Sequence, residues 1–135
     1  MSKLRLVAAL YALALLGAAA LNYVPGLTDD QGRAFGIFAL DIYDDSLHLA
    51  SASWAAVSAW WSARASRVFL LYFGILYFLD GLLGLATGSG YLDLGILVYG
   101  VQDLPFGFKI LANLPHLFLG GAAIVASRIF GHEAE

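Results

Sequence analysis

Four apolar segments constrain this chain more than any other feature of its sequence. They cover about residues 4–21, 42–61, 68–87 and 114–130, and each approaches the roughly 20 residues that a membrane-spanning helix needs. The chain is 61% hydrophobic and 13% charged, whereas about 25% of the residues in soluble domains are charged. The sequence therefore predicts an all-α fold: a four-transmembrane-helix up-down bundle that forms a single integral membrane domain over residues 1–135.

The connection before the second apolar segment also has a helical pattern. Phe35, Phe38 and Ile42 are spaced so that they would share one face of a helix. We therefore expect the second helix to begin near Gln31 and to project above the bilayer. The expected helices then cover about residues 4–21, 31–62, 67–87 and 113–130.

The positive charges predict how the chain is oriented. If the four segments alternate in direction, five of the seven basic residues fall on one side of the membrane: Lys3, Arg5, Arg64, Arg67 and Arg128. By the positive-inside rule that side is cytoplasmic, so both termini are expected in the cytoplasm. The first segment also has the pattern of a cleavable signal peptide, but residues 22–25 (NYVP) indicate a helix stop, and we expect this helix to be retained.

A short motif occurs twice in the sequence. Residues 45–49 (DSLHL) and residues 113–117 (NLPHL) both follow the pattern [DN]-x-x-H-L. Each copy precedes a run of small residues, and each stands at the start of a helix that is expected to run in the same direction. The sequence therefore predicts a bundle made of two repeated helical hairpins.

Three stretches, in addition to this repeat, resemble the sequences of a known protein family: FGIF at residues 35–38, YFGILYFLDGLLGL at residues 72–85, and NLPHLFLGGAAIV at residues 113–125. On these stretches, the chain resembles the small bacterial membrane family known as domain of unknown function 4383, over about residues 25–125. The resemblance implies four transmembrane helices in a bacterial inner membrane and no established activity. Asp45 stands where the family is expected to have an asparagine.

Three ionisable side chains from three helices are expected at nearly the same depth. At a rise of 1.5 Å per residue, His48, Asp80 and His116 each lie about 20 Å from the cytoplasmic end of their helices. A charged side chain inside a membrane costs about 2.5–3.5 kcal/mol on insertion scales, so Asp80 needs a partner, a proton or water. Gly81 and Gly84 beside it would allow another helix to approach closely. The sequence predicts a buried polar layer in which the two histidines are the partners of Asp80.

Further polar residues are expected about one helical turn above this layer. Asp45 and Asn113 lie about 4–5 Å closer to the outer surface, and Asp41 and Asp44 also belong to this outer region. We describe Asp41, Asp44 and Asn113 as an outer polar mouth. The same residues are good helix N-caps, so the mouth has a second interpretation as two capped helix entrances.

The polar layer admits several chemistries. A divalent metal such as Zn, Fe or Mn would take imidazole and carboxylate ligands from His48, Asp80, His116 and Asp45. A haem held between His48 and His116 is an alternative, and so is a purely structural set of hydrogen bonds. A metal-dependent membrane hydrolase is a further alternative, but the chain has no catalytic motif, and we assign no catalytic residue.

The expected partners follow from the composition. The lipid bilayer surrounds the chain, and the small-residue faces would suit contacts with a second copy or with another membrane protein. The net charge of −3 gives no basic patch for nucleic acid. The most general expectation is a membrane accessory or interaction protein in the inner membrane whose polar layer binds a divalent metal.

Overall fold

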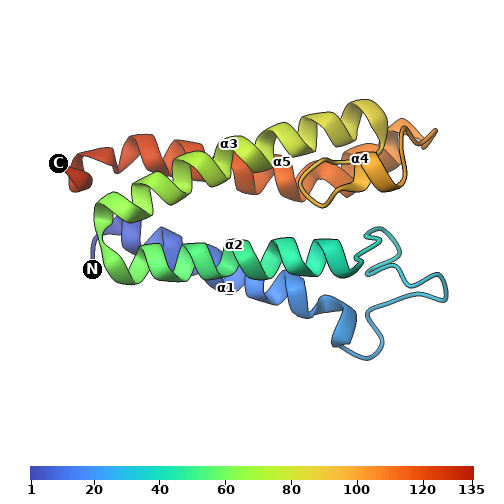
Figure 1. Ribbon diagram of the computed structural model, residues 1–135, viewed down its shortest axis with the longest axis horizontal. Helices are drawn as coiled ribbons and strands as arrows, with labels where there is room; N and C mark the ends of the chain where they lie inside the picture. Colours follow the sequence, from blue (N-terminus) through green and yellow to red (C-terminus); the bar gives the residue numbers. More distant parts are fainter.

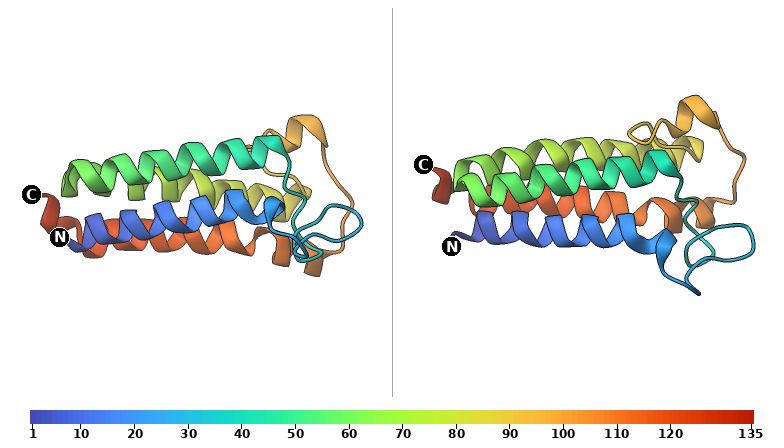
Figure 2. Two further views of the ribbon diagram at one scale, coloured as in Figure 1. Left: turned by 90° about the horizontal axis from the view of Figure 1, so that it is seen from below. Right: turned by 60° about the horizontal axis from the view of Figure 1, so that its bottom comes forward.

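The computed structural model describes residues 1–135 and is all-helical, in agreement with the predicted fold class. Four long helices lie alongside one another (Figure 1): α1 (Lys3–Ala20), α2 (Ile42–Trp61), α3 (Ala63–Thr87) and α5 (Phe106–Ile129). Three short helices complete the structure: η1 (Leu21–Tyr23), α4 (Gly95–Val98) and η2 (Gly131–Ala134). Both termini lie at one end of the long helices, and the two long loops gather at the other end (Figure 2).

The long helices pack as two pairs. The main contacts of α1 are with α2, and those of α3 are with α5. Glycines allow the second pair to approach closely, because a Cβ atom added to Gly120 would lie 2.7 Å from the carbonyl oxygen of Gly74. Gly81 and Gly84, which the sequence indicated as contact points, lie against Leu117 and Asn113 of α5. Small residues on α3 and α5 thus determine the spacing of this pair.

A buried aromatic stack lies between the pairs. Phe69, Phe73 and Tyr77 follow one another on α3, and the rings of Phe73 and Tyr77 are stacked with centroids 4.0 Å apart. Tyr11 of α1 packs edge-on against Phe73, and its hydroxyl donates to the carbonyl oxygen of Leu119. Dispersion and area burial by these rings hold α1 against the other pair.

Three helices are long and apolar enough to cross a membrane: Lys3–Tyr23, Ala63–Thr87 and Phe106–Ile129. This finding supports the prediction of a membrane protein. The helix α2 is not among them. Its sequence contains Asp44, Asp45 and four serines, which lower its mean hydropathy.

The predicted start of the second helix near Gln31 is wrong. The helix begins at Ile42, after an N-cap at Asp41 whose carboxylate accepts from the backbone N–H groups of Tyr43 and Asp44. The preceding segment is a loop, because Gly32 and Gly36 have positive φ angles and Phe35 also adopts a φ of 54°. The helical spacing of Phe35, Phe38 and Ile42 was therefore not sufficient to form a helix, because the backbone of this segment adopts turn conformations.

Two other helix starts also differ from the prediction. The last long helix begins at Phe106 instead of residue 113, and Pro115 lies inside it. The third helix begins at Ala63 instead of residue 67, because the side chain of Ser62 accepts from the backbone N–H of Ala65 and separates it from α2. The earlier start of α5 puts Asn113 and His116 in the interior of a helix, about two and three turns from its first residue.

A polar pocket at the loop end of the helices

A cavity of about 420 Å³ lies at the end of the long helices that is opposite the termini. It is lined by α2, α3, α5 and the two long loops. Its charged and imidazole side chains are Arg33, Asp44, His48, Asp80, Asp93 and His116. The structure therefore brings the three predicted layer residues, His48, Asp80 and His116, to the wall of one pocket.

Asp80 and His116 form the closest polar contact in this pocket. The Nδ1 atom of His116 lies 2.5 Å from Oδ2 of Asp80, and Asp80 is only 2% exposed. Because a carboxylate can only accept, Nδ1 carries the hydrogen, and when the ring is neutral its lone pair is on Nε2. The contact therefore fixes both the orientation and the tautomer of His116.

The other oxygen of Asp80 is held by the backbone of the loop after α3. Oδ1 accepts from the N–H groups of Tyr91, at 2.8 Å, and Leu92, at 2.9 Å. The loop can come this close because of Gly90, where an added Cβ would lie 2.6 Å from the same oxygen. Hydrogen bonds to a charged group contribute more than neutral ones. Asp80 is therefore fully partnered, which compensates for its burial.

His48 stands next to His116 but lacks a comparable partner. The two ring centroids are 6.3 Å apart, with an angle of 82° between the ring planes. His48 is 6% exposed, and its Nδ1 atom is buried without a hydrogen bond. An unpaired buried polar atom costs about 1–3 kcal/mol. A ligand in the pocket that reached this nitrogen would remove that penalty.

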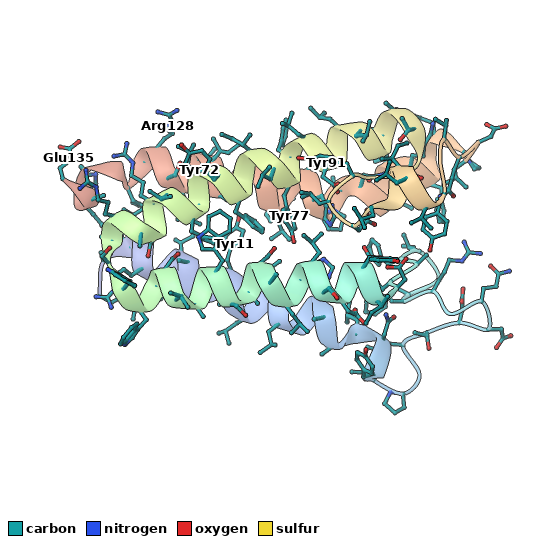
Figure 3. All side chains as sticks on the ribbon, viewed as in Figure 1. Tyr11, Tyr72, Tyr77, Tyr91, Arg128 and Glu135 are labelled. Atoms are coloured by element: carbon teal, nitrogen blue, oxygen red, sulfur yellow. The ribbon has the colours of Figure 1, made fainter.

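Tyr77 of α3 packs beside His116. Its ring lies 5.0 Å from the ring of His116, and its hydroxyl is 3.0 Å from Oγ of Ser51 on α2. In Figure 3 the Tyr77 side chain is in the space between α3 and α2. The hydrogen bond between Tyr77 and Ser51 connects the two helix pairs.

The two neighbouring aspartates of α2 face different partners. Asp44 lines the pocket, four residues before His48 on the same face of the helix. Asp45 does not line the pocket, and its Oδ2 accepts from the hydroxyl of Tyr23 at 3.1 Å. The structure thus does not bring Asp45, predicted as a fourth metal ligand, to the pocket wall that holds His48, Asp80 and His116. One residue along a helix turns the side chain by about 100°, so Asp45 faces η1 and Asp44 faces the pocket.

The residues of the predicted outer mouth have separate roles. Asn113 lines the pocket and donates to the carbonyl oxygen of Lys109 at 2.8 Å. Asp41 caps α2, as the second interpretation of the mouth expected, and also accepts from the Tyr99 hydroxyl at 2.8 Å. Partial burial acts to raise the pKa of Asp41, but hydrogen bonds from Asp44 and Tyr99 outweigh it and lower the pKa.

Asp93 and Tyr99 are pocket residues that sequence reasoning did not identify. Both come from the loop between α3 and α5, and Asp93 lines the pocket together with Asp44. Two carboxylates on the wall of one pocket repel each other unless a proton or a cation lies between them. The sequence hinted at these residues only through the presence of polar side chains in a Gly-rich apolar loop. This pattern does not indicate where the loop runs in the fold.

The arrangement does not assemble the complete predicted metal site. No group of three or more His, Cys, Asp or Glu side chains lies close enough to hold one ion. Asp80 supports His116 through Nδ1, which is the position of a residue that orients a ligand. The pocket therefore offers two imidazoles, with Asp44 and Asp93 as the further carboxylates on its wall.

The chain was also compared with known proteins. No family model, no curated protein and no solved structure matches it. The function must therefore be argued from the pocket itself.

Proposed function

We propose that this chain is an integral inner-membrane protein that binds a divalent metal ion in its outer pocket through His48 and His116. The observation that carries the proposal is the contact between Asp80 and His116. It leaves the Nε2 atom of His116 as an electron-pair donor. Histidine ligands of metals usually donate their other N–H to a carboxylate or a carbonyl oxygen, and Asp80 would have that role here.

The two imidazoles are close enough to reach one ion after a small movement. With metal–nitrogen distances of about 2.0–2.1 Å, two imidazoles on one tetrahedral ion have ring centroids about 5 Å apart. The observed separation of His48 and His116 is 6.3 Å, so the rings would move together by about 1 Å on binding. The buried, unpaired Nδ1 of His48 would gain a partner on binding.

The acidic side chains of the pocket would complete the coordination. Asp44 and Asp93 both line the pocket that also contains His48. A change of side-chain rotamer in one of them would supply the third ligand, and a divalent cation would relieve their mutual repulsion. Two imidazoles and carboxylate oxygen suit Zn, Fe or Mn. A haem is less well supported, because a macrocycle needs apolar walls and this pocket contains three carboxylates.

The membrane arrangement is part of the same proposal. We propose that α2 crosses the bilayer together with the three more apolar helices, in a four-helix up-down bundle of two hairpins. The antiparallel neighbours of α2 would shield its serines, and Asp44 and Asp45 would lie near the outer surface. The positive-inside rule then puts both termini in the cytoplasm and the pocket at the outer side.

Elemental analysis of protein purified in mild detergent, together with its absorption spectrum, tests the proposal. We expect close to one divalent metal ion per chain and no haem band in the wild-type protein. His48→Ala and His116→Ala should each lose the metal, whereas His132→Ala, which changes an exposed histidine, should retain it. Metal-free wild-type protein that also fails to take up added Zn²⁺, Fe²⁺ or Mn²⁺ would contradict the proposal and leave the pocket with a structural role.

A further inference from the structure

A second cavity lies at the opposite end of the molecule, near the termini. It has a volume of about 340 Å³ and is lined mainly by the first turns of α3 and by the last residues of the chain. Two of its residues, Arg64 and Arg67, are three positions apart on one face of α3. We call this cavity the arginine groove.

Neither arginine of the groove has an acidic partner. The structure contains two ion pairs, Arg33 with Asp29 and His116 with Asp80, and neither Arg64 nor Arg67 takes part in one. Arg67 lies against Gly131, where an added Cβ would be 3.1 Å from its Cζ atom. Two positive charges that are not in ion pairs therefore face the same groove, and Arg67 is held in position by packing against Gly131.

The groove continues into an apolar strip on the surface of α3. Val68, Leu71 and Tyr72 line its other side, and Val68 and Tyr72 are 45% and 56% exposed. Because α3 is long and apolar enough to cross a membrane, this strip faces acyl chains when the helix is in a bilayer. Figure 3 shows Tyr72 and Glu135 at this end of the molecule, with Arg128 pointing outward from α5.

The groove also lies at the depth where lipid headgroups are expected. Trp60 and Trp61 are the last two residues of α2, next to the start of α3, and are 78% and 73% exposed. Exposed tryptophans of membrane proteins collect at the level of the headgroups. A phosphate between the two arginines would thus be at its normal depth, with its acyl chains along the apolar strip.

From this arrangement, we propose that the arginine groove binds the phosphate of an anionic phospholipid, with Arg64 and Arg67 as its ligands. Guanidinium groups match phosphate oxygens in geometry and charge. Glu135 also lines the groove, and its negative charge opposes an anionic ligand. The proposal does not depend on metal binding in the outer pocket.

Native mass spectrometry of the full chain in detergent, with equal amounts of phosphatidylglycerol and phosphatidylcholine, tests the proposal. We expect the wild-type protein to retain phosphatidylglycerol preferentially. Because basic residues near an anionic membrane surface favour the binding of anionic lipid, Arg64→Gln with Arg67→Gln should reduce this preference by roughly tenfold or more. Glu135→Gln should increase it.

A matched double variant controls for the loss of general charge. Lys3→Gln with Arg128→Gln removes two positive charges from the same end of the molecule without changing the groove, and it should retain the preference. A loss of preference that is equal in both double variants would overturn the proposal. Glycerol 3-phosphate distinguishes the source of the phosphate: displacement of the lipid by this soluble compound at equal concentration would show an anion site that does not recognise lipid. Circular dichroism of each variant checks that it is folded.

Discussion

The Nδ1 atom of His116 and the Oδ2 atom of Asp80 are 2.5 Å apart, and this bond joins α5 to α3 at the centre of the outer pocket. The other oxygen of Asp80 accepts two backbone hydrogen bonds from the loop that covers the pocket. One buried carboxylate thus orients an imidazole and fixes a loop. The pair therefore has both a structural role and, in our proposal, a functional one.

Asp80→Asn should separate these two roles. The amide keeps the size of the side chain but loses its charge, so we expect a loss of about 2 to 4 kcal/mol in unfolding free energy, close to the cost of breaking a buried pair. Loss of a residue that orients a metal ligand lowers metal affinity by about 10- to 100-fold. Thermal unfolding in detergent and metal titration measure the two effects. Unchanged metal affinity in a folded Asp80→Asn protein would show that Asp80 does not support a ligand.

The contact between α3 and α5 should not tolerate larger residues. A Cβ atom at Gly120 would lie 2.5 Å from the backbone nitrogen of Phe78, so Gly120→Ala forces the helices apart, and we expect a cost of about 1–3 kcal/mol. At Gly17, in the helix α1, an added Cβ meets nothing within 4 Å. Gly17→Ala should therefore stabilise the protein by about 0.5–1 kcal/mol. Melting temperatures that fall equally in both variants would be inconsistent with this packing.

The bond between Tyr99 and Asp41 should be visible in a pH titration. The hydrogen bond to Asp41 and the negative charge of Asp41 raise the pKa of Tyr99 above 10, and the pKa of Asp41 is lowered. A raised tyrosine pKa stabilises the fold below the unfolded value of about 10, and a lowered aspartate pKa does so above about 3.9. The contribution of Tyr99 is therefore lost as the pH rises through its folded pKa. That of Asp41 is lost as the pH falls through its own.

The absorbance of phenolate measures this effect directly. The difference between the wild-type protein and Tyr99→Phe gives the titration of Tyr99 alone. Asp41→Asn keeps a good N-cap but removes the charge, so it should move the Tyr99 midpoint back toward the ordinary value. A midpoint that is the same with and without the Asp41 charge would argue against the contact.

The four proposed membrane crossings can be tested because the chain contains no cysteine. Single substitutions Asp30→Cys and Asp103→Cys put a thiol in each long loop, and Arg64→Cys and Glu135→Cys put one at the other end. In intact cells, a membrane-impermeant maleimide should label only the two loop positions. Labelling of position 64 together with position 30 would mean that α2 does not cross the membrane.

The sequence was sufficient to predict the all-α fold and the need of Asp80 for a partner. Apolar length defined the helices, and the rise per residue put His48, Asp80 and His116 at one level. It was not sufficient to predict which side of α2 faces the pocket, because the angular position of a helix depends on packing between the helix pairs. Asp44, predicted in the outer polar mouth, lines the pocket, whereas Asp45, predicted as a metal ligand, does not.

The loops were harder to predict for a different physical reason. Phe35 and Leu94 have positive φ angles that no local preference favours, so tertiary contacts impose these conformations. Asp93 and Tyr99 reach the pocket only because the loop before α5 is tied to Asp80 and Asp41. Such long-range hydrogen bonds leave no periodic pattern in the sequence.

Calorimetric titration of Zn²⁺ into the chelator-treated, detergent-purified protein tests the central claim most directly. We predict one ion per chain in the wild-type protein. His48→Ala and His116→Ala should each lower the affinity by at least about tenfold, and His132→Ala should bind like the wild type. Equal binding by all four proteins, or no binding by the wild type, would contradict the proposal that His48 and His116 form a metal site.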